Sequence, residues 1–365
     1  MSKKILLKGN DALCEGAVQS GCRAYYGYPI TPQNEVPAYM SKRMIEVNGS
    51  FIQAESELAS INMVLGAAVT GARAMTTSSS PGISLMQEGI SYLAGCELPC
   101  LIANIMRGGP GLGNISGSQS DYFQSTRGGG HGDYRTICLA PSTVQELYDF
   151  PALGFHLAEK YRSPVIIVAD GFLAQMMEGV DLDYSKNLRD KIAKEKLPEK
   201  NWVLNGCVGR EPRFIRSLFM VDGALKDHNY KLQEKYGKIN DSEQLWEEYN
   251  MADAKKAIVA FGVTGRIAKE AIKSLGDQKI GLIRPITLWP FPKKAFEKYL
   301  KQLESILVVE LNSGQMVEDV LLSVSGKVSV DFLGKPGGEI ITPDEITEKI
   351  SKIKSTEKVK ASSNG

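Results

Sequence analysis

The sequence has few of the residues that build metal sites from protein ligands alone. It contains three histidines and six cysteines, and the cysteines are scattered along the chain. Zinc and iron–sulfur sites usually take four such ligands from closely spaced sets. The nearest pair, Cys96 and Cys100, has no companion pair. We therefore expect reduced thiols, and no metal held by this chain alone.

Excess charge and long apolar runs are also absent. The chain has 43 basic and 42 acidic residues, for a formal net charge of +1, which argues against nucleic-acid binding. No apolar run is long enough to cross a bilayer, and the N-terminus leads straight into a strand. Neither a Walker-type Gly-Lys-Ser/Thr nor a Gly-x-Gly-x-x-Gly follows the first strand. We expect a cytoplasmic protein that acts without nucleic acid or membrane.

What is present indicates an α/β protein. A length of 365 residues suits two domains, and 43% hydrophobic and 23% charged residues are typical of globular proteins. Through residue 175, strands and helices alternate, which predicts a doubly wound, mostly parallel sheet. The charged stretch 176–253 is interpreted as an irregular connector or arm, with an acidic helix over Asp241–Asn250. A smaller α/β domain is expected over 254–354, and a disordered tail over 355–365.

The predicted strands are short apolar runs bounded by polar or glycine-rich segments. In the first domain they are Lys4–Lys8, Ala24–Tyr28, Ser50–Ala54, Ala72–Ser78, Pro99–Met106, Ile137–Ala140 and Pro164–Ala169. In the second they are Lys256–Gly262, Lys279–Arg284, Ile306–Leu311 and Val328–Phe332.

The most constrained stretch is Gly-Tyr-Pro-Ile-Thr-Pro at 27–32. Its two prolines fix φ and push the residue before each towards extended backbone. We expect a rigid turn that ends a strand and opens a helix, with Thr31 as N-cap and Pro32 as the first helical residue. Ligands bind at the carboxyl ends of strands in open α/β sheets, so Pro29, Ile30 and Thr31 are pocket candidates. A capped helix without further function fits the same residues.

A long glycine-rich segment covers Arg107–Arg135. Loops of this length are usually functional or disordered, and the interleaved polar residues together with the flanking strands favour function. Asn114, Gln119 and Asp121 could line a pocket, or could pin the loop by local hydrogen bonds. His131 could donate a proton or simply be solvated.

Five stretches taken in order resemble one family, the α subunits of 2-oxoacid:ferredoxin oxidoreductases. They are Tyr28–Pro32, Glu55–Glu57, Met106–Gly111, Gly128–Gly132 and Leu282–Pro292. The likeness covers about residues 3–350 and is strongest to short α chains acting on branched-chain 2-oxoacids, such as 3-methyl-2-oxobutanoate, or on 2-oxoglutarate. It implies an aminopyrimidine-side thiamine-diphosphate-binding domain over 1–175 and a transketolase C-terminal-like domain over 254–354. The implied reaction is oxidative decarboxylation of a 2-oxoacid with coenzyme A to acyl-CoA and CO₂, reducing ferredoxin.

The same resemblance implies roles for three residues. Glu57 matches the glutamate that hydrogen-bonds the cofactor's aminopyrimidine ring, although an acidic residue there would also complement a helix dipole. Arg107 matches the arginine that binds the substrate carboxylate, for which a guanidinium fork is suited. The alternative for Arg107 is a salt bridge that braces the loop. Thr31 matches the threonine whose hydroxyl meets the same end of the substrate. Arg284 and Trp289 are expected to be structural or to face a partner.

One segment of such enzymes is missing, the Gly-Asp-Gly that helps to hold Mg²⁺ and the diphosphate; residues 132–134 read Gly-Asp-Tyr. The resemblance therefore implies a β subunit that brings the diphosphate site, Mg²⁺ and a 4Fe-4S cluster. It also implies separate γ and ferredoxin-like δ subunits, with ferredoxin and coenzyme A as reaction partners. Two alternatives stay open: a non-redox, transketolase-like subunit, and a catalytically silent scaffolding subunit.

Overall fold

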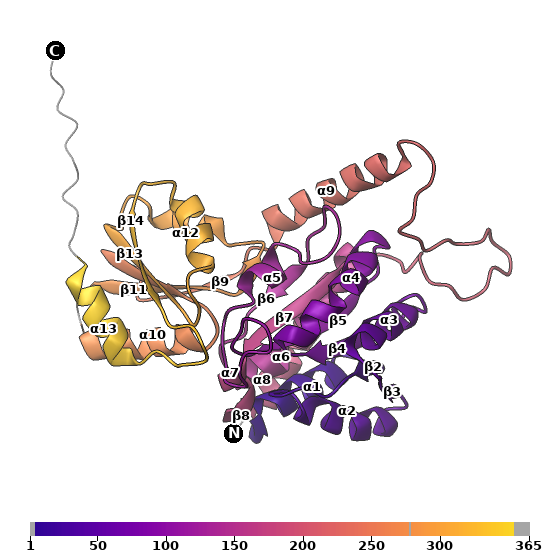
Figure 1. The fold of residues 1–365 in the computed structure, drawn as a ribbon, viewed down its shortest axis with the longest axis horizontal. Helices are drawn as coiled ribbons and strands as arrows, with labels where there is room; N and C mark the ends of the chain where they lie inside the picture. The colour runs from indigo at the N-terminus through magenta and orange to yellow at the C-terminus, as the bar shows by residue number, and fades with distance from the viewer. Residues whose placement is uncertain (1–3, 277–278, 354–365) are drawn as a thin grey trace, which may run out of the picture.

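The computed structural model describes residues 4–276 and 279–353, which form two α/β units that lie next to each other (Figure 1). The first unit is built on a seven-stranded sheet of order β12-β6-β7-β5-β4-β2-β3. Its strands are β2 (Ala24–Gly27), β3 (Ser50–Gln53), β4 (Ala74–Ser78), β5 (Cys100–Met106), β6 (Ile137–Leu139), β7 (Pro164–Asp170) and β12 (Thr287–Trp289). All neighbours are parallel except β12, which runs antiparallel to β6. The predicted doubly wound parallel sheet is confirmed.

Helices cover both faces of this sheet. On one face lie α3 (Glu57–Ala68) and α4 (Ser80–Gly95), which pack against each other and against the central strands. On the other face lie α2 (Glu35–Glu46) and α6 (Val144–Tyr161), with α1 (Gly9–Gln19) packed on both (Figure 1). Because both faces are covered, the central strands β5 and β7 are buried along their whole length.

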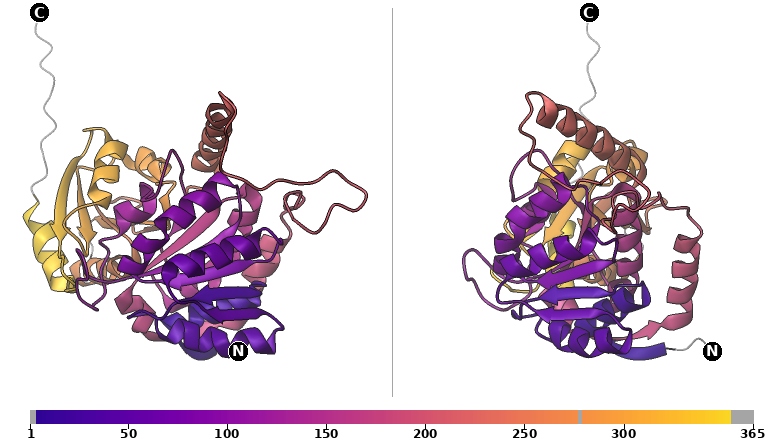
Figure 2. Two further views of the ribbon diagram at one scale, coloured as in Figure 1. Left: turned by 45° about the vertical axis from the view of Figure 1, so that its right-hand side comes forward. Right: turned by 90° about the vertical axis from the view of Figure 1, so that its right-hand side faces the viewer.

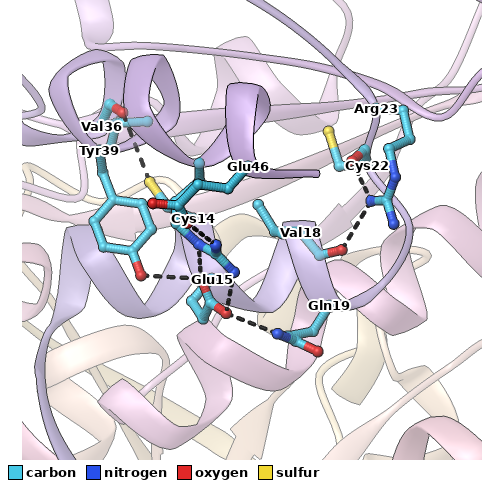
Figure 3. A network of polar contacts seen from close by, with 10 residues as sticks. Cys14, Glu15, Val18, Gln19, Cys22, Arg23, Val36, Tyr39 and Glu46 are labelled. Carbon is cyan, nitrogen blue, oxygen red and sulfur yellow. Dashed lines mark hydrogen bonds and ion pairs between the residues drawn. The ribbon is translucent and has the colours of Figure 1, made fainter. Parts of the chain in front are cut away.

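Polar contacts tie α1 to α2 at the surface (Figure 3). Arg43 donates to Glu15 from Nε at 2.8 Å and also pairs with Glu46. The Tyr39 hydroxyl donates to the same Glu15 carboxylate at 2.9 Å. These contacts orient α2 and therefore the turn that precedes it.

The second unit has a five-stranded sheet of order β14-β13-β10-β11-β9. Its strands are β9 (Trp246–Tyr249), β10 (Lys256–Ala260), β11 (Ile280–Pro285), β13 (Ser305–Glu310) and β14 (Ser329–Gly334). Only β9 is antiparallel to its neighbour. One pair of helices, α10 (Gly262–Leu275) and α13 (Pro343–Lys352), packs together, and so does a second pair, α11 (Lys293–Tyr299) and α12 (Met316–Val324).

The expected irregular connector, 176–253, is more ordered than its sequence indicates. After the short α7 (Gly171–Gln175), β8 (Met177–Asp181) pairs antiparallel with β1 (Lys4–Lys8) as a separate two-stranded sheet. Two helices follow, α8 (Leu182–Ala193) and α9 (Ala224–Ser242). The predicted acidic helix over Asp241–Asn250 is wrong, because α9 ends at Ser242 and the strand β9 occupies residues 246–249. The longest stretch without helix or strand in this region is 194–223, and we call it the arm.

The domain bounds stay a prediction, since the chain crosses between the two units more than once. β12 belongs by sequence to the second unit but extends the sheet of the first. The predicted tail at 355–365 lies outside the described residues. Among the helices that the structure describes, none has the length and apolar character needed to span a membrane.

A buried arginine links the two units. Arg284 on β11 is 2% exposed. Its guanidinium donates to both carboxylate oxygens of Glu146 on α6, at 2.6 and 3.1 Å, and to Glu247 on β9 at 2.6 Å. Trp289 on β12 meets the ring of Tyr236 edge-on, with 5.9 Å between centroids. Both residues are structural in this chain.

Candidate active site

The strand connections place a crevice at the carboxyl edge of the first sheet. From β2 the chain passes through α2 to β3, and from β4 it passes through α4, on the opposite face, to β5. In open α/β sheets the crevice outside such a switch point is where ligands bind. The turn 28–32 follows β2, Glu57 follows β3, Ser78 ends β4, and Ser79 and Ser80 come directly after it. The predicted candidates Glu57 and Thr31 therefore lie at this edge.

Glu57 is the first residue of α3 and is buried, with 4% of its surface exposed. The preceding Ser56 caps the helix, because its hydroxyl accepts from the Ala59 N–H at 3.2 Å. Within the described residues, the one hydrogen-bond donor to the Glu57 carboxylate is the Ser78 hydroxyl, at 3.4 Å. A long single hydrogen bond leaves most of the carboxylate's acceptor capacity for something else.

The close approach of α4 to this carboxylate requires a glycine. A Cβ atom at Gly82 would lie 2.0 Å from Ser78 Oγ and 2.3 Å from Glu57 Oε1. Sequence reasoning missed Ser78 and Gly82, although the run of serines that ends in Pro81-Gly82 after β4 was a signal for a polar turn. The glycine thus makes room for a buried carboxylate at the start of α4.

Residues 29–32 do not cap a helix as predicted. The N-cap of α2 is Asn34, and Thr31 and Pro32 lie in the turn before it. The Thr31 hydroxyl accepts a hydrogen bond from the Asn34 amide at 3.3 Å. Pro29 and Ile30 are half-buried in the same turn. The predicted turn is present, but the prediction that Thr31 is the N-cap of the following helix is wrong.

Gln33 fixes this turn from inside, and it was not predicted. Its side-chain amide donates to the Tyr28 carbonyl at 3.1 Å and accepts from the Thr77 hydroxyl at 2.7 Å. Thr77 in turn lies 2.7 Å from the Tyr25 hydroxyl. All three partners of the network are fully buried side chains, at 0% exposure. The turn is therefore held by contacts between β2 and β4 that sequence proximity does not reveal.

Arg107 follows β5 and reaches towards the turn. Its Nη1 donates to the Thr31 carbonyl at 2.9 Å, and its Nη2 donates to the Leu112 carbonyl at 3.2 Å. The residue is 6% exposed, and its buried Nε has no partner among the described residues. No carboxylate pairs with this guanidinium in the part of the chain that the structure describes, so the predicted alternative of a bracing salt bridge is wrong. The structure brings Arg107 and Thr31 together.

The glycine-rich segment is an ordered loop that bonds to the second unit. It contains the short helix α5 (Tyr122–Thr126). Gln119, a pocket candidate, donates instead to the Phe261 carbonyl at 2.8 Å and accepts from the Leu311 N–H at 3.1 Å. Asn114, also a candidate, is exposed and donates to the Gly337 carbonyl at 2.7 Å. Both residues pin the loop.

A second buried contact completes this seam between the units. Asp170, at the end of β7, accepts from the Leu173 N–H and from the Val263 N–H of the second unit, both at 2.9 Å. Burial raises the pKa of this carboxyl group. Gly262 has φ +59°, and a Cβ there would lie 2.7 Å from the Gln119 amide. We call Gln119, Asp170 and their partners in the second unit the polar seam.

Asp121 holds the base of the loop. It accepts from the Ser80 hydroxyl at 2.5 Å and from the Asn104 amide at 2.9 Å. Burial raises the pKa of Asp121 above its usual range, against the opposing effect of these hydrogen bonds. The Ser80 hydroxyl also accepts from the Arg107 N–H at 3.0 Å. A lone amide within the apolar strand β5 was the signal that could have pointed to Asn104.

His131 lies elsewhere. It is exposed and lines a cavity of about 510 Å³ with Tyr92, Tyr134 and His228. That cavity is not lined by Glu57, Thr31 or Arg107. The structure therefore does not place His131 with the other site candidates.

Two cavities border the site. One, of about 310 Å³, is lined by Thr31, Glu35, Ile115 and Gln175, among others. The other, of about 490 Å³, lies between the units beside Pro110. None of the residues lining the first is a cation. Groups of three or more potential metal-ligating His, Cys, Asp or Glu residues are not found within the described chain.

Comparison with known proteins adds the family context. Residues 15–248 match the family described as pyruvate flavodoxin/ferredoxin oxidoreductase, thiamine-diphosphate-binding, and residues 254–346 match pyruvate:ferredoxin oxidoreductase core domain II. The ketoisovalerate oxidoreductase subunit VorB of Methanothermobacter marburgensis is 44% identical, over 95% of this chain and 97% of that protein. The 2-oxoglutarate synthase subunit KorA of Methanocaldococcus jannaschii is 36% identical, over 94% and 98%.

Solved structures agree. A 2-oxoglutarate:ferredoxin oxidoreductase from Magnetococcus marinus, solved with 2-oxoglutarate, coenzyme A and succinyl-CoA bound, superposes with a TM-score of 0.83 at 28% identity. The match covers 96% of this chain, but only 65% of that one, so the present chain spans less than two thirds of it. A split-gene transketolase superposes with a TM-score of 0.57 at 12% identity, which shows a shared fold alone.

The residues at the crevice fit one end of thiamine diphosphate. A buried carboxylate with spare acceptor capacity, the unpartnered hydroxyl of Ser79 and the unpartnered Nε of Arg107 are polar groups that a bound molecule would satisfy. These unsatisfied donors and acceptors are available to a polar ligand in the crevice.

Replacing Gly82 by alanine tests the packing around Glu57. The added methyl group meets Ser78 and Glu57, so we expect Gly82→Ala to lower the free energy of unfolding by about 1–3 kcal/mol. The matched control is Gly66→Ala on α3, where a Cβ meets nothing within 4 Å and alanine should stabilise by up to about 1 kcal/mol. Thermal unfolding followed by circular dichroism measures both. Equal melting temperatures for the two variants would contradict the described contact.

Proposed function

This chain belongs to the 2-oxoacid:ferredoxin oxidoreductases as an α subunit, and we propose that it contributes half of an active site for a branched-chain 2-oxoacid. The observation that carries the proposal is that Glu57, Thr31 and Arg107 all lie at the carboxyl edge of the first sheet, where Arg107 donates to the Thr31 carbonyl. The sequence left two alternatives open, a non-redox transketolase-like subunit and a silent scaffold. The relatives at 44% and 36% identity are named as subunits of 2-oxoacid-converting enzymes and support neither alternative.

We propose that Glu57 binds the aminopyrimidine ring of thiamine diphosphate. When bound, this cofactor supplies the carbon nucleophile that attacks the oxo group. The Glu57 carboxyl would share a proton with a ring nitrogen through the oxygen that Ser78 leaves free. Its burial beside Gly82 keeps water from competing for that hydrogen bond.

Arg107 is proposed to bind the substrate carboxylate. Two of its N–H groups are used by the carbonyls of Thr31 and Leu112, which orient the guanidinium plane. The unpartnered Nε–H and a remaining Nη–H can then form a bidentate pair with a carboxylate. Thr31 lies beside Arg107, and its hydroxyl is proposed to contact the acid group or the neighbouring oxo oxygen.

The substrate side chain is proposed to be apolar. Ile115 lines the cavity next to Thr31, and Leu112 and Ile115 on the loop are 81% and 65% exposed. A second carboxylate, as in 2-oxoglutarate, would lie beside the Glu35 carboxylate in that cavity, and the nearby Lys8 ammonium is already paired with Glu35 at 2.6 Å. Like charges that share a site repel each other. The likeness to the ketoisovalerate subunit supports the same choice.

A β subunit is proposed to complete the site. It would supply the diphosphate site, Mg²⁺ and a 4Fe-4S cluster, for which this chain offers no motif. Separate γ and ferredoxin-like δ chains would handle coenzyme A and electron transfer to ferredoxin.

A 2-oxoacid panel tests substrate choice. The chain is co-expressed with its β, γ and δ subunits, and reduction of a viologen dye is followed with coenzyme A present. We expect kcat/KM for 3-methyl-2-oxobutanoate to exceed that for 2-oxoglutarate by about tenfold or more, because a carboxylate would be left unpaired. A higher kcat/KM for 2-oxoglutarate would contradict the proposed apolar pocket. It would leave the family assignment unchanged.

Replacing Glu57 tests its contact with the ring. We expect Glu57→Gln to lower kcat by roughly 10²–10⁴-fold and to weaken thiamine diphosphate retention, measured by cofactor content after gel filtration. The control is Glu55→Gln, because Glu55 is exposed at the same strand end. Wild-type cofactor content and turnover in the Glu57 variant would remove this residue from the site.

Replacing Arg107 by lysine tests whether its guanidinium group binds the substrate carboxylate through two hydrogen bonds. A lysine ammonium group cannot form the bidentate pair. We therefore expect KM for the oxoacid to rise roughly 10- to 100-fold, which corresponds to the loss of one hydrogen bond to a charged group. Arg127→Lys is the control, because Arg127 pairs with Asp319 away from the crevice. An unchanged KM in the Arg107 variant would count against carboxylate binding.

A further inference from the structure

Three polar side chains behind Arg107 form a closed set of hydrogen bonds that the proposed function does not use. They are Asn104 on β5, Ser80 at the start of α4 and Asp121 in the glycine-rich segment. We call these three residues the Asp121 cluster. Asn104 is fully buried and Ser80 is 7% exposed. In such a buried network every polar group needs a partner, so the direction of each hydrogen bond follows from which groups can donate.

The backbone N–H of Ser80 fixes these directions, because it can only donate. It donates to Asn104 Oδ1 at 3.0 Å, so the NH₂ group of the Asn104 amide faces the other way. That NH₂ group donates to Asp121 Oδ2 at 2.9 Å. An ionised carboxylate can only accept, and the Ser80 hydroxyl therefore donates to the same oxygen, at 2.5 Å.

The hydroxyl of Ser80 links the cluster to the backbone of Arg107. A hydroxyl has one proton, and here that proton lies toward Asp121. The Ser80 oxygen is left as an acceptor, and it accepts from the Arg107 N–H at 3.0 Å. The Arg107 carbonyl is 3.3 Å from the same oxygen. Without the Asp121 carboxylate, the hydroxyl proton could turn to that carbonyl, and the hydrogen bond to the N–H would lose its fixed geometry.

The backbone at Arg107 is where the glycine-rich loop leaves the sheet. Arg107 forms an isolated antiparallel bridge with Gly117, and the Gly108 N–H donates to the Ser116 carbonyl at 3.0 Å. A guanidinium moves with its own backbone, so the position of this backbone sets how the group meets a ligand beside Thr31. Binding groups of this kind must be held within about 0.5 Å of their productive geometry.

The second unit holds Asp121 in place. The carbonyl of the preceding Ser120 accepts from the side-chain amide of Gln315 at 2.7 Å. The oxygen of the same amide accepts from the Phe123 N–H at 2.8 Å. Figure 2 shows the second unit, in orange and yellow, beside the purple first unit. Contacts on both sides of Asp121 in the chain therefore present its carboxylate to Ser80.

An acceptor role for Asp121 fits the structure better than a direct charge pair with Arg107. Burial raises the pKa of Asp121, and the positive charge of Arg107 opposes that rise. In the described part of the chain, however, no hydrogen bond or ion pair joins the Asp121 carboxylate to the Arg107 guanidinium, whose hydrogen bonds go to two backbone carbonyls. The path between the two residues runs through Ser80 and the backbone.

We propose that Asp121 is a positioning residue for substrate binding, which directs the Ser80 hydroxyl so that Ser80 holds the Arg107 backbone where the guanidinium meets the oxoacid carboxylate. The inference rests on the proposed role of Arg107. Asp121 does not touch the substrate. The position requires an acceptor at Oδ2, and the oxygen of an asparagine amide supplies one as well.

Steady-state kinetics of the complex co-expressed with its β, γ and δ subunits test the proposal. Asp121→Ala and Ser80→Ala should each raise KM for 3-methyl-2-oxobutanoate about tenfold and leave kcat within about twofold, because binding and not the chemical step is weakened. Asp121→Asn should keep KM within about twofold of wild type, since its amide oxygen accepts from the same two donors. The control is Ser313→Ala, because Ser313 is exposed and lines the same 490 Å³ cavity as Asp121.

Combining Asp121→Ala with Arg107→Lys shows whether one residue acts through the other. Residues of one network have non-additive effects, so adding Asp121→Ala to the Arg107→Lys enzyme should raise KM less than about threefold. If Asp121→Ala does not assemble, Ser80→Ala makes the same test, since alanine is favoured in helices.

The outcomes separate this inference from the proposed function. A wild-type KM in Ser80→Ala, or a KM in Asp121→Asn as high as in Asp121→Ala, would overturn the positioning role. Additive factors in the double variant would also overturn it and would leave the role of Arg107 intact. An unchanged KM in Arg107→Lys alone would overturn the proposed function and this inference together.

Discussion

The polar seam between the two units is the constraint on which the site depends. The Gln119 side chain satisfies a carbonyl and an N–H of the second unit, and the Asp170 carboxylate accepts from one N–H on each side. A buried polar group that loses its hydrogen-bond partner raises the free energy of the protein. Separating the two units would therefore be energetically unfavourable. The seam fixes the glycine-rich loop, and the loop in turn presents the Leu112 carbonyl that orients Arg107. The orientation of Arg107 in the first unit is thus stabilised by contacts with the second.

The elements with strong local patterns could be predicted from the sequence. The parallel strands of both sheets were predicted within a few residues, because buried strands are continuous apolar runs. The strands that were missed are β8, β9 and β12. They are short, charged or bounded by proline, and each is stabilised by pairing with a strand far away in the chain. No local period encodes such partners.

For the site, residue type and position at a strand end were informative, but bonding partners were not. Glu57, Thr31 and Arg107 do converge at the carboxyl edge. For Gln119 the sequence left open a pocket position or a role in pinning the loop; it pins the loop, but through the second unit and not through local hydrogen bonds. A loop sequence does not indicate which way an amide points. Gln33 was missed because its partners, Tyr28 and Thr77, come together only when β2 and β4 pair.

The crossing of β12 into the first sheet has a consequence for the order of events during synthesis. β6 is an edge strand until residues 287–289 are added beside it. A nascent chain that has finished the first unit by sequence therefore still displays an open row of backbone N–H and C=O groups on the ribosome. The first sheet therefore gains its last strand only after residues 287–289, well inside the second unit by sequence, have been synthesised.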